Sequence, residues 1–161
     1  MTSQPRSCSQ CRKEVSLASL DAIHGEEAGV WRVTLNGMPA YVCSVGHKRF
    51  VSPEFGMQYI EALLSNKYAL PAPTGEKRGL LRKRYHCAKC GEQLEPAAAK
   101  SARVERKVEI KGGAPFAVEI ELPLYRCGGC GAEHLRSSEE ITDAVMKASA
   151  HAFRSVELSP I

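Results

Sequence analysis

Cys87-Ala88-Lys89-Cys90 and Cys127-Gly128-Gly129-Cys130 are two CxxC pairs separated by 36 residues, and they decide the fold. Each CxxC turn directs two thiolates towards one point, and a β-hairpin between the pairs would bring the two turns together. Four cysteines arranged in this way can bind one zinc ion. This spacing is the most specific signal in the sequence.

An earlier stretch repeats the pattern. Cys8-Ser9-Gln10-Cys11 is followed after 31 residues by Cys43, and His47 follows with three residues between. The CxxC pairs that open the two copies are offset by 79 residues, which places the copies in register. With His47 as the fourth ligand, the first copy forms a Cys₃His site, a common zinc ligand set. The alternative is a surface role for His47, with His24 as the fourth ligand.

These residues resemble the zinc-ribbon group, in which two cysteine knuckles close the ends of a β-hairpin. The resemblance covers about 45 residues around Cys87-Ala88-Lys89-Cys90-Gly91 and Cys127-Gly128-Gly129-Cys130-Gly131, and extends more loosely over residues 8–47. Arg12 departs from the pattern, because a glycine usually follows the second cysteine. The resemblance implies structural zinc and leaves the task open, since the group includes transcription, ribosomal, RNA-processing and adaptor proteins.

The repeat predicts two small domains within the 161 residues. Residues 1–68 would form an N-terminal Cys₃His zinc module with a helix, and residues 85–161 a C-terminal Cys₄ zinc ribbon with a long helix. Residues 69–84, which contain proline, glycine and many basic side chains, would link them. We expect a small, metal-stabilised α+β fold made of two tandem zinc-ribbon-like β-hairpin modules, each followed by an α-helix.

Local patterns predict the elements of each module. Alternating apolar residues on both sides of Asn36-Gly37 predict a hairpin from Val30 to Cys43, and Trp31 is expected in its core. Residues 104–110 and 116–122, joined by a glycine turn, predict a second hairpin with one apolar and one acidic face. Helices are predicted from Ser52 to Ser65 and, behind a capping box at Ser137, over about 18 residues.

Composition limits the compartment and the partners. Seven cysteines are an odd number, and no signal segment precedes them, which argues against a secreted disulfide framework. No apolar run approaches the ~20 residues of a membrane span. We therefore expect a cytoplasmic protein with two Zn²⁺ ions per chain and no membrane partner. Ligation of zinc by seven thiolates would lower the net charge of +4 to about +1.

Positive charge concentrates in the middle of the chain, where residues 66–90 carry seven basic side chains and one acidic side chain. A basic cluster of this kind can neutralise the phosphates of DNA or RNA. The alternative is a solvated linker, or a strap that forms salt bridges with an acidic second module. The candidate nucleic-acid contacts are Lys77, Arg78, Arg82, Lys83 and Arg84.

Nothing in the sequence indicates catalysis. A catalytic zinc keeps an open position for water or substrate, whereas each predicted site has four protein ligands. The chain has no HExxH motif, no phosphate-binding glycine loop and no serine elbow. We therefore expect a protein that is not an enzyme.

Three functions are consistent with these features. The first is a protein-interaction adaptor that presents its hairpins and last helix to a protein partner. The second is a nucleic-acid-binding protein that uses the basic linker. The third is a thiol-based redox sensor, in which mild peroxide would release zinc and form reversible disulfides.

Overall fold

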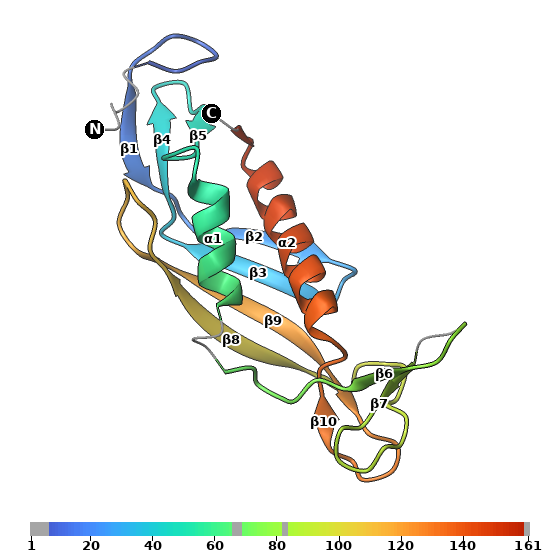
Figure 1. The fold of residues 1–161 in the computed structure, drawn as a ribbon. Helices are drawn as coiled ribbons and strands as arrows, with labels where there is room; N and C mark the ends of the chain where they lie inside the picture. The colour runs from blue at the N-terminus through green and yellow to red at the C-terminus, as the bar shows by residue number, and fades with distance from the viewer. Residues whose placement is uncertain (1–6, 66–68, 82–83, 160–161) are drawn as a thin grey trace.

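The computed structural model describes residues 7–65, 69–81 and 84–159. Figure 1 shows an elongated α+β molecule whose two helices lie on the same side of a central sheet. In chain order the strands and helices are β1 (Val15–Ser19), β2 (Ile23–Glu27), β3 (Trp31–Asn36), β4 (Pro39–Cys43), β5 (Lys48–Arg49), α1 (Phe55–Leu64), β6 (Glu76–Arg78), β7 (Arg84–His86), β8 (Lys100–Val108), β9 (Phe116–Arg126), β10 (Glu133–His134), α2 (Ser138–Ser155) and β11 (Leu158–Ser159).

The central sheet combines strands from both halves of the chain. β3 pairs with β2 on one side and with β9 on the other, and β9 also pairs with β8 and, at its end, with β10. All of these pairs are antiparallel. The register of β3 and β9 runs from Arg32 opposite Glu121 to Asn36 opposite Ala117. The predicted hairpin around residues 104–122 is therefore confirmed as β8 and β9, which pair over the full length of β8.

The predicted hairpin from Val30 to Cys43 is wrong. β3 and β4 do not pair, because β4 pairs with β1 and β5 in a second sheet that β11 completes by parallel pairing with β5. The Asn36-Gly37 turn, with φ of 75° at Gly37, instead carries the chain from one sheet to the other. A short turn signal reports a change of direction, but it does not determine which strand each flanking segment pairs with.

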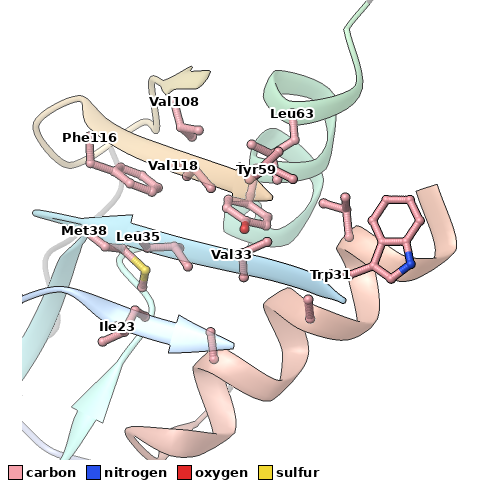
Figure 2. Packing of buried hydrophobic residues seen from close by; sticks show 14 of the residues in the cluster. Ile23, Trp31, Val33, Leu35, Met38, Tyr59, Leu63, Val108, Phe116 and Val118 are labelled. Carbon is pink, nitrogen blue, oxygen red and sulfur yellow. The ribbon is translucent and has the colours of Figure 1, made fainter. Parts of the chain in front are cut away.

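The tandem arrangement of two hairpin modules is replaced by a larger sheet with a shared core. Buried apolar residues of β3, β9, α1 and α2 belong to one cluster, part of which is shown in Figure 2. Trp31 is buried in this cluster, as predicted. The division into residues 1–68, 69–84 and 85–161 stays a prediction, and strands from the first and last of these ranges pair in one sheet.

Both predicted helices are present. The side chain of Ser137 caps α2 by accepting a hydrogen bond from the Glu140 backbone N–H at 3.1 Å, as the capping box requires. The N-cap of α1 is Glu54, not the predicted Ser52, and its side chain makes no capping hydrogen bond. Phe153, near the end of α2, packs against three aromatic rings from α1 and the segment before it: Phe50, Phe55 and Tyr59.

The exposed face of the central sheet is balanced in charge. A row of side chains crosses all four long strands, from Glu26 through Arg32 and Glu121 to Arg103, and each neighbouring pair forms a salt bridge of 2.8 to 4.0 Å. Glu121, one of the two acidic residues on the face predicted for residues 116–122, therefore forms salt bridges with arginines on both flanking strands. The prediction missed this because the partners of β9 come from distant parts of the chain.

Part of the predicted linker is folded. β6 and β7 form an antiparallel hairpin with Glu76 opposite His86, which projects from the end of the molecule near β10 (Figure 1). The chain before β6 bonds to the segment after β10, with Gly75 N–H donating to the Leu135 carbonyl at 2.7 Å and Leu135 N–H donating to the Pro73 carbonyl at 2.9 Å. Among the described residues, no helix has the length and apolar character that crossing a bilayer requires.

Close packing of α2 on β2 gives a test of the fold. A Cβ atom on Gly25 would lie 1.9 Å from the Ala148 carbonyl oxygen and 2.6 Å from the Ala152 nitrogen. We expect Gly25→Ala to lower the free energy of unfolding by roughly 1–3 kcal/mol, because the helix must move away from the sheet. Denaturant unfolding would measure the change.

Gly56→Ala is the matched control. A Cβ on this glycine of α1 meets no atom within 4 Å, and alanine favours helix over glycine by up to about 1 kcal/mol. The control should therefore be neutral or stabilising. Equal stability of Gly25→Ala and the unchanged protein would contradict the packing of α2 on β2.

Candidate metal centres

The structure brings together all eight predicted metal ligands in the predicted two groups. Within each group the ligand atoms lie within 4.8 Å of one another. The first group lies where β4 ends, and the second lies where β7 and β9 end, at the opposite end of the molecule (Figure 1). The two groups are Cys8, Cys11, Cys43 and His47, and Cys87, Cys90, Cys127 and Cys130.

The first group contains His47 and excludes His24. The Nδ1 atom of His47 lies 3.5 Å from the Sγ atom of Cys8, and the Sγ atoms of Cys11 and Cys43 lie 3.7 Å apart. His24 instead lies on β2, where its Nδ1 atom is 3.1 Å from the Thr34 hydroxyl. Of the two histidines that the sequence offered, the structure therefore groups His47 with the three cysteines.

The second group consists of sulfur atoms alone. The Sγ atoms of Cys87 and Cys130 lie 3.7 Å apart, and those of Cys90 and Cys127 lie 3.3 Å apart. All seven cysteines are free thiols rather than disulfides. Cys87 and Cys127 are buried, whereas Cys90 and Cys130 are exposed.

These distances fit tetrahedral coordination of zinc. Zn–S bonds of about 2.3 Å at tetrahedral angles separate two sulfur atoms by about 3.8 Å, and a sulfur and an imidazole nitrogen by about 3.6 Å. Three of the four measured separations lie within about 0.1 Å of these values. The donor sets, Cys₃His and Cys₄, are those of structural zinc sites.

A common turn forms three of the four ligand pairs. In each, the N–H of the first cysteine donates to the carbonyl five residues later, at 2.7 Å for Cys8, 2.7 Å for Cys87 and 2.8 Å for Cys127. The residue after the second cysteine is left-handed in each turn, with φ of 60° at Arg12, 82° at Gly91 and 73° at Gly131. Arg12 therefore adopts the left-handed conformation that glycine adopts without strain in the other two turns. The first turn thus forms although it lacks the usual glycine.

The Cys43 to His47 turn is one residue shorter. The Cys43 N–H donates to the carbonyl four residues later, that of His47, at 3.1 Å, and the left-handed residue is Gly46, with φ of 99°. The second ligand of this pair therefore follows the left-handed residue instead of preceding it.

Backbone N–H groups favour the thiolate form of selected cysteines. The N–H of Cys130 is the main cause that lowers the pKa of the Cys127 thiol to about 6, and the N–H of Gly129 contributes. Burial acts to raise the pKa of Cys43, but the N–H groups of Val45 and His47 outweigh it and bring the pKa to about 6. Thiolates are the form that binds metal.

Crowding of the sulfur atoms opposes ionisation of Cys90. The N–H of Glu92 acts to lower the pKa of Cys90, but the sulfur atoms around it, Cys127 first, raise that pKa to about 11. Four thiolates this close repel one another unless a cation lies between them. The arrangement is therefore one in which a bound divalent cation completes the charge balance.

His134 connects the two turns of the Cys₄ group and was not predicted. Its ring is 1% exposed, its Nε2 atom accepts from the Ala88 N–H at 3.3 Å, and its Nδ1 atom lies 3.2 Å from the Ala132 carbonyl. It therefore bonds to the backbone inside both turns. His134 follows Cys130 by four residues, the spacing of a possible ligand, but nothing in the sequence separates a ligand from a bridging histidine.

Arg136 joins the Cys₄ end of the molecule to α2. Its guanidinium lies 4.5 Å from the ring centroid of Tyr125 and 5.7 Å from that of Tyr85, and it forms a two-point salt bridge with Glu140 in the first turn of α2. Tyr85 and Tyr125 precede the two cysteine pairs by two residues each. The orientation of both turns is thus coupled to the helix.

The predicted nucleic-acid contacts are only partly described. Lys77 and Arg78 lie on β6 and Arg84 lies on β7, all with exposed side chains, whereas Arg82 and Lys83 lie outside the described residues. Arg78 forms a salt bridge with Glu76 at 2.7 Å, and the Lys77 ammonium lies 5.9 Å from the ring centroid of Tyr85. The hairpin therefore brings together three of the five residues.

The chain shows two cysteine and histidine clusters consistent with zinc-ribbon-like metal sites. Comparisons with protein-family models, with curated proteins and with solved structures gave no match. The donor atoms and their geometry are therefore the basis for assigning the sites.

The assignment of His47 predicts a difference between two histidine variants. Native mass spectrometry of the unchanged protein should show two zinc ions per chain. His47→Ala should weaken zinc binding at the first centre, because a cysteine triad leaves one coordination position to water. Competition with a chromophoric chelator would measure the loss.

His24→Ala is the control, since its imidazole bonds to Thr34 and lies away from both groups. It should keep two ions with unchanged affinity. Loss of zinc from His24→Ala, with full retention by His47→Ala, would reverse the assignment.

Proposed function

We propose that this protein is a non-catalytic zinc-binding adaptor, in which both ions are structural and the β6–β7 hairpin docks on a protein partner. Four protein ligands at each centre support the structural role, because they leave no position for water or substrate. A cytoplasmic location and the absence of enzymatic activity belong to the same proposal. The metal would stabilise the surface of the protein that contacts the partner.

Two leucines at the tip of the hairpin carry the adaptor proposal. Leu80 and Leu81 are each 100% exposed, and they follow the end of β6 after one intervening residue, Gly79. Scattered exposed apolar residues are ordinary, but two adjacent leucines on a projecting tip are costly to leave in water unless a partner covers them. Exposed cations on the same hairpin, including Lys77 and Arg84, favour a partner with acidic groups around an apolar pocket.

The base of the hairpin rests on the Cys₄ centre, which couples binding to metal. The Leu94 N–H donates to the Tyr85 carbonyl at 2.9 Å. His86 forms an isolated antiparallel β-bridge with Gln93, and Leu94 forms another with Cys127. His86 also places its Nδ1 atom 3.1 Å from the Gly91 carbonyl. Removal of the metal would therefore release the platform on which the hairpin stands.

The adaptor proposal is tested by quantitative affinity capture with the full chain as bait. A partner of the hairpin should be captured by the zinc-loaded protein and lost with Leu80→Ser/Leu81→Ser and after chelation. The captured protein, once purified, should bind the bait directly. The control Met57→Ser removes a different apolar side chain, 69% exposed on α1, and should leave capture unchanged. Equal capture by the double serine variant would exclude the hairpin tip as the docking element.

A nucleic-acid role for the same hairpin is the second candidate, favoured by the exposed side chains of Lys77, Arg78 and Arg84. Five phosphate contacts by the basic residues of 77–84 predict a log-log salt slope of about −4.5 for duplex DNA, at ~0.9 per contact. Lys77→Ala/Arg78→Ala/Arg84→Ala should reduce the slope to about −2, because three of those contacts are removed. Arg32→Ala, on the sheet, is the control. Absence of binding at low salt would remove this candidate.

The redox-sensor hypothesis is the third. It is supported by the exposure of Cys90 and Cys130 at the Cys₄ centre, which would give an oxidant access to sulfur.

A further inference from the structure

His134 is a buried polar side chain that contacts the backbone of both turns of the Cys₄ group. Its Nε2 atom accepts from the Ala88 N–H at 3.3 Å, and its Nδ1 atom lies 3.2 Å from the Ala132 carbonyl oxygen. A backbone N–H can only donate and a carbonyl can only accept, so these partners select the tautomer with its proton on Nδ1. One ring thus joins two turns that are far apart in the chain.

Each partner of His134 belongs to a turn that presents a cysteine pair. Ala88 lies inside the first CxxC pair of the group. The Ala132 carbonyl also accepts from the Cys127 N–H at 2.8 Å, which is the hydrogen bond that closes the second turn. His134 itself is not one of the four clustered ligands. It therefore acts on the position of the turns and not as a ligand.

The position of the ring is itself fixed by the fold. His134 lies on β10, opposite Tyr125 of β9. The next residue, Leu135, is 1% exposed and hydrogen-bonds through its backbone to Pro73 and Gly75. A side chain on a paired strand is placed more precisely than one on a loop. The two turns are therefore referred to a rigid element that neither of them contains.

The separation of the sulfur atoms gives this bridge a consequence for ion size. The pairs Cys87–Cys130 and Cys90–Cys127 each span the two turns, and their Sγ atoms lie 3.7 Å and 3.3 Å apart. Tetrahedral zinc sets this separation at about 3.8 Å. Cd²⁺, a larger cation that also binds thiolates, requires longer bonds to sulfur. The two turns must move apart to admit it.

We propose that His134 is a positioning residue that holds the two turns of the Cys₄ centre at the separation that suits Zn²⁺ and opposes larger thiolate-binding cations such as Cd²⁺. The inference rests on the structural zinc proposed above for this centre. Groups that orient the ligands of a metal without binding it contribute about 10- to 100-fold to metal affinity. His134 contacts both turns at once, so its loss should affect the size of the site as well as its affinity.

The test measures the Zn²⁺ and Cd²⁺ affinities of the full chain by competition with a chromophoric chelator. His134→Leu removes both hydrogen bonds and should weaken Zn²⁺ binding at the Cys₄ centre roughly tenfold or more. Cd²⁺ binding should weaken by a smaller factor, so the ratio of affinities shifts towards Cd²⁺. Alkylation of the cysteines released as metal is withdrawn, followed by peptide mass spectrometry, assigns each loss to a centre. The Cys₃His centre should be unchanged.

Two polar variants test the bridge directly. His134→Asn can still donate to the Ala132 carbonyl but is too short to reach Ala88, so it should resemble His134→Leu. His134→Gln places an amide oxygen farther along the side chain, where it can accept from the Ala88 N–H, and should restore much of the preference for Zn²⁺. The matched control is His151→Leu, because the Nδ1 atom of His151 accepts from the Glu26 N–H at 3.0 Å, away from both centres. It should keep both affinities.

Three results would overturn the inference. They are an unchanged Zn²⁺ affinity at the Cys₄ centre of His134→Leu, an equal loss for Zn²⁺ and Cd²⁺, and an equal loss at the Cys₃His centre, since general destabilisation weakens every ion and site alike. If His134→Leu does not fold, the same ratio compared between His134→Asn and His134→Gln decides. A full chain that binds no zinc at the Cys₄ centre would refute the proposed function together with this inference. Zinc bound there with an unaltered ratio would refute this inference alone.

Discussion

Pairing between β3 and β9 is the constraint on which the rest of the molecule depends. Residues 32–36 pair with residues 117–121, so the pairing closes a very long loop of chain. The conformational entropy lost in closing this loop is offset only by the contacts that form once the strands have met. Once it forms, the apolar faces of both strands become one surface, and α1 and α2 cover that surface together. The charged row from Glu26 to Arg103 on the opposite face also exists only because the four strands lie side by side. Two hairpins that folded separately would lack this shared core.

A metal ion bound at each cluster would have a different task at the two ends of such a structure. Few apolar residues surround the Cys₄ group, where the buried cluster consists of Cys87, Leu94, Tyr125 and Cys127. A cluster of this size contributes little stability, and a structural zinc supplies folding free energy where the core does not. At the other end, Cys8 and Cys11 precede β1, and their link to Cys43 and His47 ties the start of the chain to the sheet that β11 completes. The central core thus stabilises the middle of the molecule, and metal bound at the two clusters would stabilise the ends.

The sequence predicted the features that depend on neighbouring residues and missed those that depend on residues far apart in the chain. Cys87, Cys90, Cys127 and Cys130 were predicted because a cysteine turn is specified by five or six consecutive residues, and the same holds for the Ser137 cap of α2. The pairing of β3 with β9 was missed, because alternation identifies a strand and its buried face but contains no information on its neighbour. His134 was missed for a related reason. Its role depends on burial by distant segments, and a histidine after a cysteine pair has the same local sequence on a surface.

The charge of the Cys₄ centre bears on the meaning of the basic hairpin. Four thiolates with one Zn²⁺ ion would carry a net charge of about −2, and the segment that packs on this centre has an excess of basic residues. Several of these cations already have partners near the turns: Arg78 with Glu76, Lys77 with the Tyr85 ring and Arg84 with Gln93. Balancing the centre therefore accounts for part of the charge without a phosphate ligand. No such internal explanation applies to Leu80 and Leu81, which contribute nothing to the core and remain fully exposed. For this reason the apolar tip, more than the cations, is the feature on which the proposal of a protein partner over a nucleic acid rests.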